Sequence, residues 1–332
     1  MNTDKKQYLC DVPVLCLFFN RPDLFAAVFK QVKQARPSKL FLYQDGPRDK
    51  NDLLGIQACR DIANDIDWDC EVHTMYLEKN QGCDPSGYLS RKWAFQYVDR
   101  LVILEDDTVP SISFFSFCKE LLDKYLYDSR ITMIAGMNYE EETKDCPYDY
   151  LFTSDCSIWG WATWKRVFDR WESNYDFLSD EYHMKLLSKY MKNTNQPKRL
   201  LPMFKRHMES GKEYFESILI SDHLLQHGLS IVPKKNLISN IGITADSVHF
   251  NGSIKTMPKS AARIFTMQRF EIGQPLKHPK YIMENLYYKD SIDKILARNK
   301  PLVRFWRQIQ TFVLRAWYGD YASIIRSVKK RL

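Results

Sequence analysis

Short apolar runs alternate with amphipathic segments over the first 125 residues of the chain. Apolar runs predict strands at residues 12–19, 40–43 and 101–104, and an alternating pattern predicts a further strand at 70–77. After each run, apolar residues recur at helical spacing, which predicts helices near 24–32, 51–66, 88–98 and 114–125. Because strand and helix alternate in this way, we expect an α/β fold with a mostly parallel central sheet and helices on its faces.

The pattern is more irregular after residue 125. Apolar runs predict strands at 131–137 and 229–232, and helical spacing predicts helices at 165–192, 199–210 and 215–227. The last of these helices ends before Gly228, a residue type that often follows a helix C-terminus. No internal repeat and no low-complexity linker divides this part of the chain.

The strand predicted at 101–104 ends in three consecutive carboxylates, Glu105, Asp106 and Asp107. In open α/β sheets, ligands bind outside the carboxyl ends of the strands. Adjacent carboxylates repel one another, and a divalent cation relieves that repulsion. Mg²⁺ or Mn²⁺ held by one or two carboxylates and by substrate phosphates is the expected arrangement. An exposed acidic turn without a ligand is the alternative.

The C-terminal segment has a different character. From Pro301, apolar residues fall on one helical face and arginines on the other. A basic amphipathic helix with Trp and Phe on its apolar face is typical of an interfacial membrane anchor. We therefore expect residues 301–332 to contact an anionic membrane surface. Docking of the apolar face on the rest of the protein is the alternative.

Composition narrows the class of protein. The chain has 332 residues, of which 45% are hydrophobic, so a large core is feasible. No apolar run approaches the ~18 residues of a membrane span, and the polar start, Met1 to Gln7, does not lead into a signal peptide. The eight scattered cysteines favour a reducing, cytoplasmic setting.

The net charge of +7 is concentrated at the C-terminal end of the chain. Eight basic residues and one acidic residue lie from Lys300 onward, which accounts for this net charge. This distribution argues against nucleic-acid binding.

Several motifs, taken in order, carry a resemblance to a known family. The acidic motif at 105–107 is followed by Pro110 and by the pair Phe114-Phe115. The other matching motifs are Asn20-Arg21-Pro22, Gln44-Asp45-Gly46, Asn80 with Gly82-Cys83, Trp159-Gly160-Trp161-Ala162-Thr163-Trp164, Asn240-Ile241-Gly242 and His249. From about Val12 to His249 the chain resembles nucleotide-sugar glycosyltransferases of the GT-A fold, in the branch of N-acetylglucosaminyltransferase I and the bacterial hemolytic-protein-like transferases. The resemblance implies a Rossmann-like sheet with a helical C-terminal extension.

The resemblance also implies roles for these residues. Asp107, the last acid of this DXD-type motif, would bind Mn²⁺ or Mg²⁺, and His249 would bind the metal or the diphosphate, with Asp246 as a lesser option. Glu105 and Asp106 would hold ribose or water. The remaining donor-site residues would be Asn20, Arg21 at phosphate, Asp45 at the pyrimidine, Asn80, and the Gly-Trp loop Trp159, Gly160 and Trp161 beside the sugar.

Two acidic residues are candidates for the general base. An inverting transfer needs a base to take the proton of the acceptor hydroxyl. Comparison with the family favours Glu216 over Asp222, although many relatives carry Asp beside Trp where this chain has Glu preceded by Phe. A retaining mechanism without such a base is a further alternative.

These observations predict a two-part chain. We expect a catalytic domain at 1–275 and a basic amphipathic helical tail at 276–332. The expected reaction moves a sugar from a UDP-sugar to a hydroxyl of a glycan or lipid-linked glycan, in surface polysaccharide synthesis, at the inner face of the cell membrane. One rival is a nucleotidyltransferase of similar fold; such enzymes carry a Gly-rich basic loop after the first strand, where this chain has Asn20-Arg21-Pro22-Asp23. Another is a non-catalytic glycan- or partner-binding domain.

Overall fold

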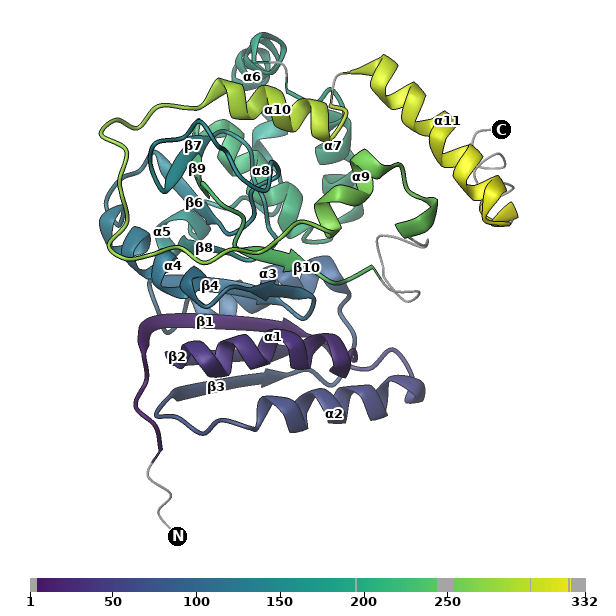
Figure 1. Cartoon of the computed structure of the whole chain (residues 1–332). Helices are drawn as coiled ribbons and strands as arrows, with labels where there is room; N and C mark the ends of the chain where they lie inside the picture. The colour runs from purple at the N-terminus through teal and green to yellow at the C-terminus, as the bar shows by residue number, and fades with distance from the viewer. Residues whose placement is uncertain (1–4, 195, 244–253, 299, 322, 324–332) are drawn as a thin grey trace.

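An eight-stranded sheet forms the centre of the computed structural model, which describes residues 5–194, 196–243, 254–298, 300–321 and 323 (Figure 1). The strand order is β3-β2-β1-β4-β8-β6-β9-β7. These strands are β1 (Cys10–Phe18), β2 (Pro37–Gln44), β3 (Glu71–Tyr76), β4 (Arg100–Glu105), β6 (Ile131–Ala135), β7 (Tyr150–Thr153), β8 (Trp161–Trp164) and β9 (Leu229–Pro233).

Six of the eight strands run in one direction. β1 pairs in parallel with β2 and β4, β2 with β3, and β6 with β9, whereas β8 and β7 run antiparallel to their neighbours. The predicted α/β fold with a mostly parallel, Rossmann-like sheet is therefore confirmed. Because parallel strands end at the same edge, the loops after β1, β2 and β4 lie together. A small second sheet pairs β5 (Thr108–Pro110) with β10 (Ile238–Asn240).

Helices cover both faces of the sheet. Alternate residues of the central strands point to opposite faces, so Val14 and Val102 join one apolar cluster and Leu15 and Ile103 the other. The first cluster includes residues of α1 (Pro22–Ala35), α2 (Leu53–Ala63) and α4 (Ser113–Lys124), and the second includes residues of α3 (Cys83–Ala94), α6 (Glu181–Asn193), α7 (Leu200–Ser210) and α8 (Phe215–Leu225). Short helices complete this part: η1 (Lys50–Asp52), α5 (Lys165–Phe168), η2 (Asp176–Ser179), η3 (Ile254–Thr256), α9 (Lys259–Ala262) and η4 (Arg263–Phe265).

The last two helices differ in how far they are buried against the rest of the protein. α10 (Leu286–Ile295) buries Tyr288 and Ile292 against Leu151 and Val232 of the sheet. α11 (Pro301–Trp317) contains no buried residue and lies beside the main body (Figure 1). No described helix is long and apolar enough to cross a membrane. The division of the chain at 275/276 stays a prediction, although α10 packs on the sheet.

Two local predictions are wrong. The helix predicted over 165–192 is broken into α5, η2 and α6, because Tyr175 adopts a left-handed conformation with φ of 54° and Asp180 caps α6 by accepting a hydrogen bond from His183 N. The tryptophan-rich segment, expected to be a loop, contains strand β8, which inserts antiparallel between β4 and β6. That strand depends on partners distant in the sequence, which local patterns do not show.

Candidate functional site

The three consecutive carboxylates lie where β4 ends at the carboxyl edge of the sheet. Glu105 is the last residue of β4 and pairs with Leu17 of β1. Thr108 fixes the turn, because Glu105 N donates to Thr108 Oγ1 over 2.9 Å and this hydroxyl donates to Glu105 O over 3.1 Å. We call residues 105–107 the acidic turn. It lies at the edge where an open α/β sheet binds ligands.

Arg21, which lies between β1 and α1, spans the acidic turn. Its Nε donates to Asp106 Oδ2 over 3.2 Å, its Nη2 also donates to Asp106 Oδ1, and the same Nη2 donates to Asp107 Oδ2 over 2.9 Å. The side chains of Asp106 and Asp107 are 6% and 15% exposed. A guanidinium that neutralises two adjacent carboxylates removes most of their mutual repulsion.

A second cation, Arg91 on α3, lies fully buried near the acidic turn. Its Nη1 donates to Gly87 O, while Nε and Nη2 have no hydrogen-bond partner among the described residues. The guanidinium lies 4.2 Å from the ring centre of Phe215 and 5.2 Å from that of Trp161. Burial lowers the pKa of Arg91 to about 10, and the negative charge of Glu105 opposes this effect.

Burial also changes the acidity of Glu105. Its withdrawal from water, together with the charge of Asp107, raises the pKa of Glu105 to about 8, and Arg91 opposes this shift. The charge of Glu216 raises the same pKa, which places Glu216 within electrostatic reach of the acidic turn. A carboxyl group with a strongly raised pKa at such an edge is a feature of functional sites.

The two candidate bases have different surroundings. Glu216 is exposed in the first turn of α8. α8 packs closely on α3 here, since a Cβ at Gly87 would lie 2.3 Å from the ring of Phe215. Asp222, by contrast, is buried and accepts hydrogen bonds from Arg170 Nε and Nη2 over 3.1 and 2.9 Å. Both oxygens of Asp222 are therefore engaged by one guanidinium, and of the two acids Glu216 is the one accessible to an acceptor.

Asp45, which follows β2, holds the neighbouring loop in place. One oxygen accepts from Gly46 N and Gln81 N, and the other accepts from Asn80 Nδ2 and Gly82 N, over 2.8 to 3.0 Å. Asn80 Nδ2 also donates to Gly46 O over 2.9 Å. This differs from the expectation that the Asp45 carboxylate contacts a pyrimidine, since both of its oxygens already accept two hydrogen bonds.

Asn20 lies in the loop after β1 but points to a different partner from Arg21. Its Nδ2 donates to Asp52 Oδ1 over 2.6 Å. Asp52 also accepts from Arg48, whose hydrogen bonds lower the pKa of Asp52 to about 2. Asn20 therefore joins the loop after β1 to η1.

The segment after β10 closes over the acidic turn. Asn240 of β10 pairs with Thr108, and Ile241 N donates to Asp107 O over 2.9 Å. A Cβ at Gly242 would lie 2.2 Å from Asp107 Oδ2, so a glycine is needed where this backbone approaches the carboxylate. The sequence prediction at His249, like that at Asp246, lies outside the described residues.

The Gly-Trp segment is divided between the site and the core. Gly160 has φ of +60°, and a Cβ there would lie 2.4 Å from Ile238 Cδ1. Trp159 is half-buried, with its ring centre 5.1 Å from that of Phe265. Trp161 is 1% exposed. Trp161 packs under Arg91 within the core, and its place beside a sugar stays a prediction.

The residues of the acidic turn fit a metal that takes most of its ligands from a substrate. Among the described residues, no group of three or more His, Cys, Asp or Glu side chains could hold a metal ion by itself. Asp107 offers a partly exposed carboxylate beside Asp106. Mg²⁺ bound to a nucleotide usually uses one or two protein carboxylates and the phosphates. A cation that binds Asp107 Oδ2 requires Arg21 Nη2 to release this oxygen.

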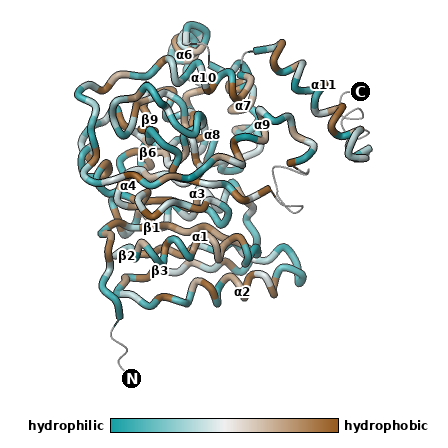
Figure 2. Tube along the Cα trace, viewed as in Figure 1, coloured by the Kyte–Doolittle hydropathy of each residue, from teal (hydrophilic) through white to brown (hydrophobic). Residues whose placement is uncertain are grey.

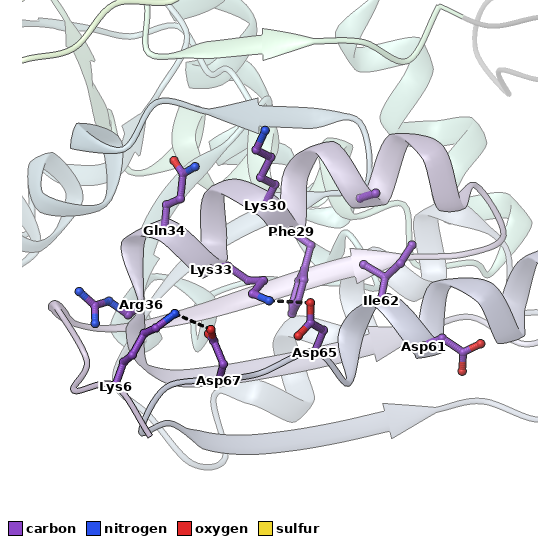
Figure 3. A pocket seen from close by; sticks show the side chains of 11 residues that line it. Lys6, Phe29, Lys30, Lys33, Gln34, Arg36, Asp61, Ile62, Asp65 and Asp67 are labelled. Atoms are coloured by element: carbon purple, nitrogen blue, oxygen red, sulfur yellow. Dashed lines mark hydrogen bonds and ion pairs between the residues drawn. The ribbon is translucent and has the colours of Figure 1, made fainter. Parts of the chain in front are cut away.

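A groove of about 930 Å³ lies elsewhere, between α1 and α2 near the amino ends of β1 and β2 (Figure 3). Ion pairs Lys6–Asp67 and Lys33–Asp65 cross it (Figure 3). The acidic turn does not contribute to its lining.

Sequence reasoning missed Arg91. Arg91 looks like a surface charge of a helix, but it shares a helical face with Gly87, Ser90 and Ala94, which are small residues that the structure buries. This spacing is the sequence signal that could have placed its side chain inside.

Comparison with known proteins does not assign this chain to a family. No family model matches the chain, and no curated protein matches it in sequence. One similar solved structure is a protein assigned as a glucose-1-phosphate thymidylyltransferase from Bacillus anthracis, in complex with sucrose. The matched region covers 48% of this chain and 73% of that protein, with 10% sequence identity and a TM-score of 0.28. Another is a UDP-glucose pyrophosphorylase in complex with UDP-glucose, where the matched region covers 48% of this chain and 71% of that protein, with 12% sequence identity and a TM-score of 0.25. With identities and TM-scores this low, neither likeness assigns an activity.

Proposed function

We propose that this protein is a metal-dependent glycosyltransferase that moves a sugar from a UDP-sugar to a hydroxyl of a glycan or lipid-linked glycan. The observation that carries the proposal is the acidic turn at the carboxyl edge of the sheet, paired with Arg21 and within electrostatic reach of the exposed Glu216. Sugar transfer needs a seat for the diphosphate and an acid-base group for the acceptor, and this edge offers side chains for both.

Each side chain receives a role in this proposal. Asp107 binds the metal, and Arg21 turns from the carboxylates to a phosphate. When bound, Mn²⁺ or Mg²⁺ supplies neutralisation of the diphosphate charge. Asp45 and Asn80 position the loop that contacts the base. Glu216 accepts the proton of the acceptor hydroxyl as that oxygen attacks the sugar carbon, and UDP leaves.

A nucleotidyltransferase is the alternative reaction on a similar sheet. Such an enzyme binds a nucleoside triphosphate and a sugar 1-phosphate and releases pyrophosphate. The loop after β1 argues against it, because Asn20-Arg21-Pro22-Asp23 contains no glycine and Arg21 folds onto the acidic turn.

Calorimetry with UDP, GDP, CDP and dTDP and their sugar derivatives, with and without Mn²⁺, tests the proposal. We expect binding of UDP and a UDP-sugar that depends on Mn²⁺. A second assay supplies each nucleoside triphosphate with a sugar 1-phosphate and measures pyrophosphate. Failure of every uridine nucleotide to bind rules out the transferase, and pyrophosphate release identifies the alternative.

A further inference from the structure

Helix α11 turns its apolar face to solvent. Leu302, Trp306, Phe312 and Trp317 are 56–83% exposed, and Phe305 and Val313 are exposed as well. These residues recur at the spacing of one helical face. Figure 2 shows the apolar bands along α11, which stands beside the main body. A helix that docked on its own domain by this face would have buried it.

The polar face of α11 is the one directed to the protein. Arg307 and Thr311, one turn apart, are half-buried, and Arg307 Nη2 donates to Lys294 O at the end of α10. α11 also contacts η3. Contact through this stripe leaves most of the apolar face exposed, and a contiguous apolar surface of this kind marks an interaction site.

A basic groove adjoins the start of α11. This groove, of about 1000 Å³, is lined by residues of α6 and α7 and by the junction of α10 with α11. Its exposed cations are Lys192, Lys198, Arg199, Lys300 and Arg304. None of these five forms an ion pair with a described residue, and no acidic side chain lines the groove. We call these five residues the basic groove.

We propose that α11 and the basic groove together bind the surface of an anionic membrane. The apolar face of α11 would enter the boundary between headgroups and acyl chains, and the basic groove would contact lipid phosphates. Anionic lipid is the occupant that matches both parts, because a second protein chain would need an acidic surface joined to an apolar groove. This surface differs from the acidic turn, and the proposal does not depend on the transferase activity.

α11 lies on the side of the molecule to which the carboxyl ends of the strands point. The arrows of β1 and β3 point to the right in Figure 1, and α11 lies at the upper right, toward the carboxyl edge of the sheet. A substrate anchored in the membrane would therefore approach the edge that carries the acidic turn.

Cosedimentation of the full chain with vesicles tests the proposal. We compare vesicles of phosphatidylcholine alone with vesicles that also contain phosphatidylglycerol, at low and high salt. The variant Trp306→Ser/Phe312→Ser removes apolar contacts, and Lys198→Gln/Arg199→Gln removes charge. Tyr127→Ser, at an exposed aromatic on another surface, and Lys30→Gln/Lys124→Gln, on α1 and α4, are the matched controls.

We expect strong binding to the anionic vesicles, weakened by salt. Each α11 or basic-groove variant should lower the partition coefficient at least about tenfold, and the controls should leave it unchanged. Equal binding to both vesicle types, absence of binding, or equal losses in the controls would overturn the proposal. So would light scattering that shows a dimer broken by Trp306→Ser/Phe312→Ser without any binding to vesicles.

Discussion

Arg21 and Asp107 form an ion pair of 2.9 Å across two loops that both end strands of the central sheet. The carboxylate proposed to bind a metal is therefore occupied by a cation of the protein itself. Arg21 stabilises the acidic turn without ligand, and a metal that binds Asp107 Oδ2 competes with Arg21 for this oxygen.

Replacing Arg21 by Gln should make the acidic turn a better site for a free metal. Without the guanidinium, the carboxylates of Asp106 and Asp107 repel each other, and together they attract a divalent cation more strongly. We expect the affinity for Mn²⁺ in the absence of nucleotide to rise about tenfold, while the affinity for UDP falls. Calorimetry measures both. Arg48→Gln, which leaves the acidic turn intact, is the control, and equal Mn²⁺ affinity in wild type and Arg21→Gln would contradict the competition.

Replacing Asp107 by Asn should abolish the effect of metal on nucleotide binding. Loss of a charged ligand reduces affinity at least about tenfold. The measurement is the rise in melting temperature on addition of UDP with Mn²⁺. Asp123→Asn removes an exposed carboxylate paired with Arg100 and Lys119 and should retain the rise. A normal rise in Asp107→Asn would show that another residue holds the metal.

Replacing Gly242 by Ala should disturb the Asp107 carboxylate, because the new Cβ would lie 2.2 Å from Oδ2. We expect weaker binding of UDP with Mn²⁺ and a modest loss of stability. Gly273→Ala is the matched control, since nothing lies within 4 Å of a Cβ there. Identical nucleotide affinities of the two variants would mean that the segment after β10 does not shape the site.

Glu216 and Asp222 can be distinguished by separating activity from stability. Glu216→Gln should lower kcat about a hundredfold or more and leave the melting temperature near that of wild type. Asp222→Asn breaks a buried pair with Arg170 and should cost about 3 kcal/mol of stability, with kcat retained by the folded protein. The reverse pattern would assign the base to Asp222.

His223 should make the protein sensitive to acid. It is buried, its Nδ1 lies 2.8 Å from Thr132 Oγ1, and burial lowers its pKa from 6.5 to about 4. The unfolded chain therefore binds more protons between these values, and about 3 kcal/mol of stability is lost as the pH falls from 6.5 to 4. Urea unfolding at several pH values should show a flatter dependence for His223→Asn than for wild type. His227→Asn, at an exposed position, should keep the wild-type slope.

The sequence predicts those parts of the fold that depend on local pattern. The apolar run before Glu105 predicts β4 and its edge, because a buried strand reads as a continuous apolar run. It does not predict β8, since Trp161 and Trp164 become strand residues through pairing with β4 and β6. The partners of Asp45 are likewise not evident in the sequence, because three of its four hydrogen bonds join β2 to a loop more than thirty residues away. Tertiary contacts decide such cases.

The strand order implies a sequence of events during synthesis of the protein. β3, β2, β1 and β4 are contiguous neighbours from residues 10–105, whereas the other half of the sheet comes from residues 131–233. Arg21 can thus meet Asp106 and Asp107 as soon as the first third of the chain has left the ribosome. Gly242 is synthesised later and closes over an acidic turn that is already paired with Arg21. We expect Arg21 to pair with Asp106 and Asp107 in the nascent N-terminal part of the chain, before the rest of the site has been synthesised.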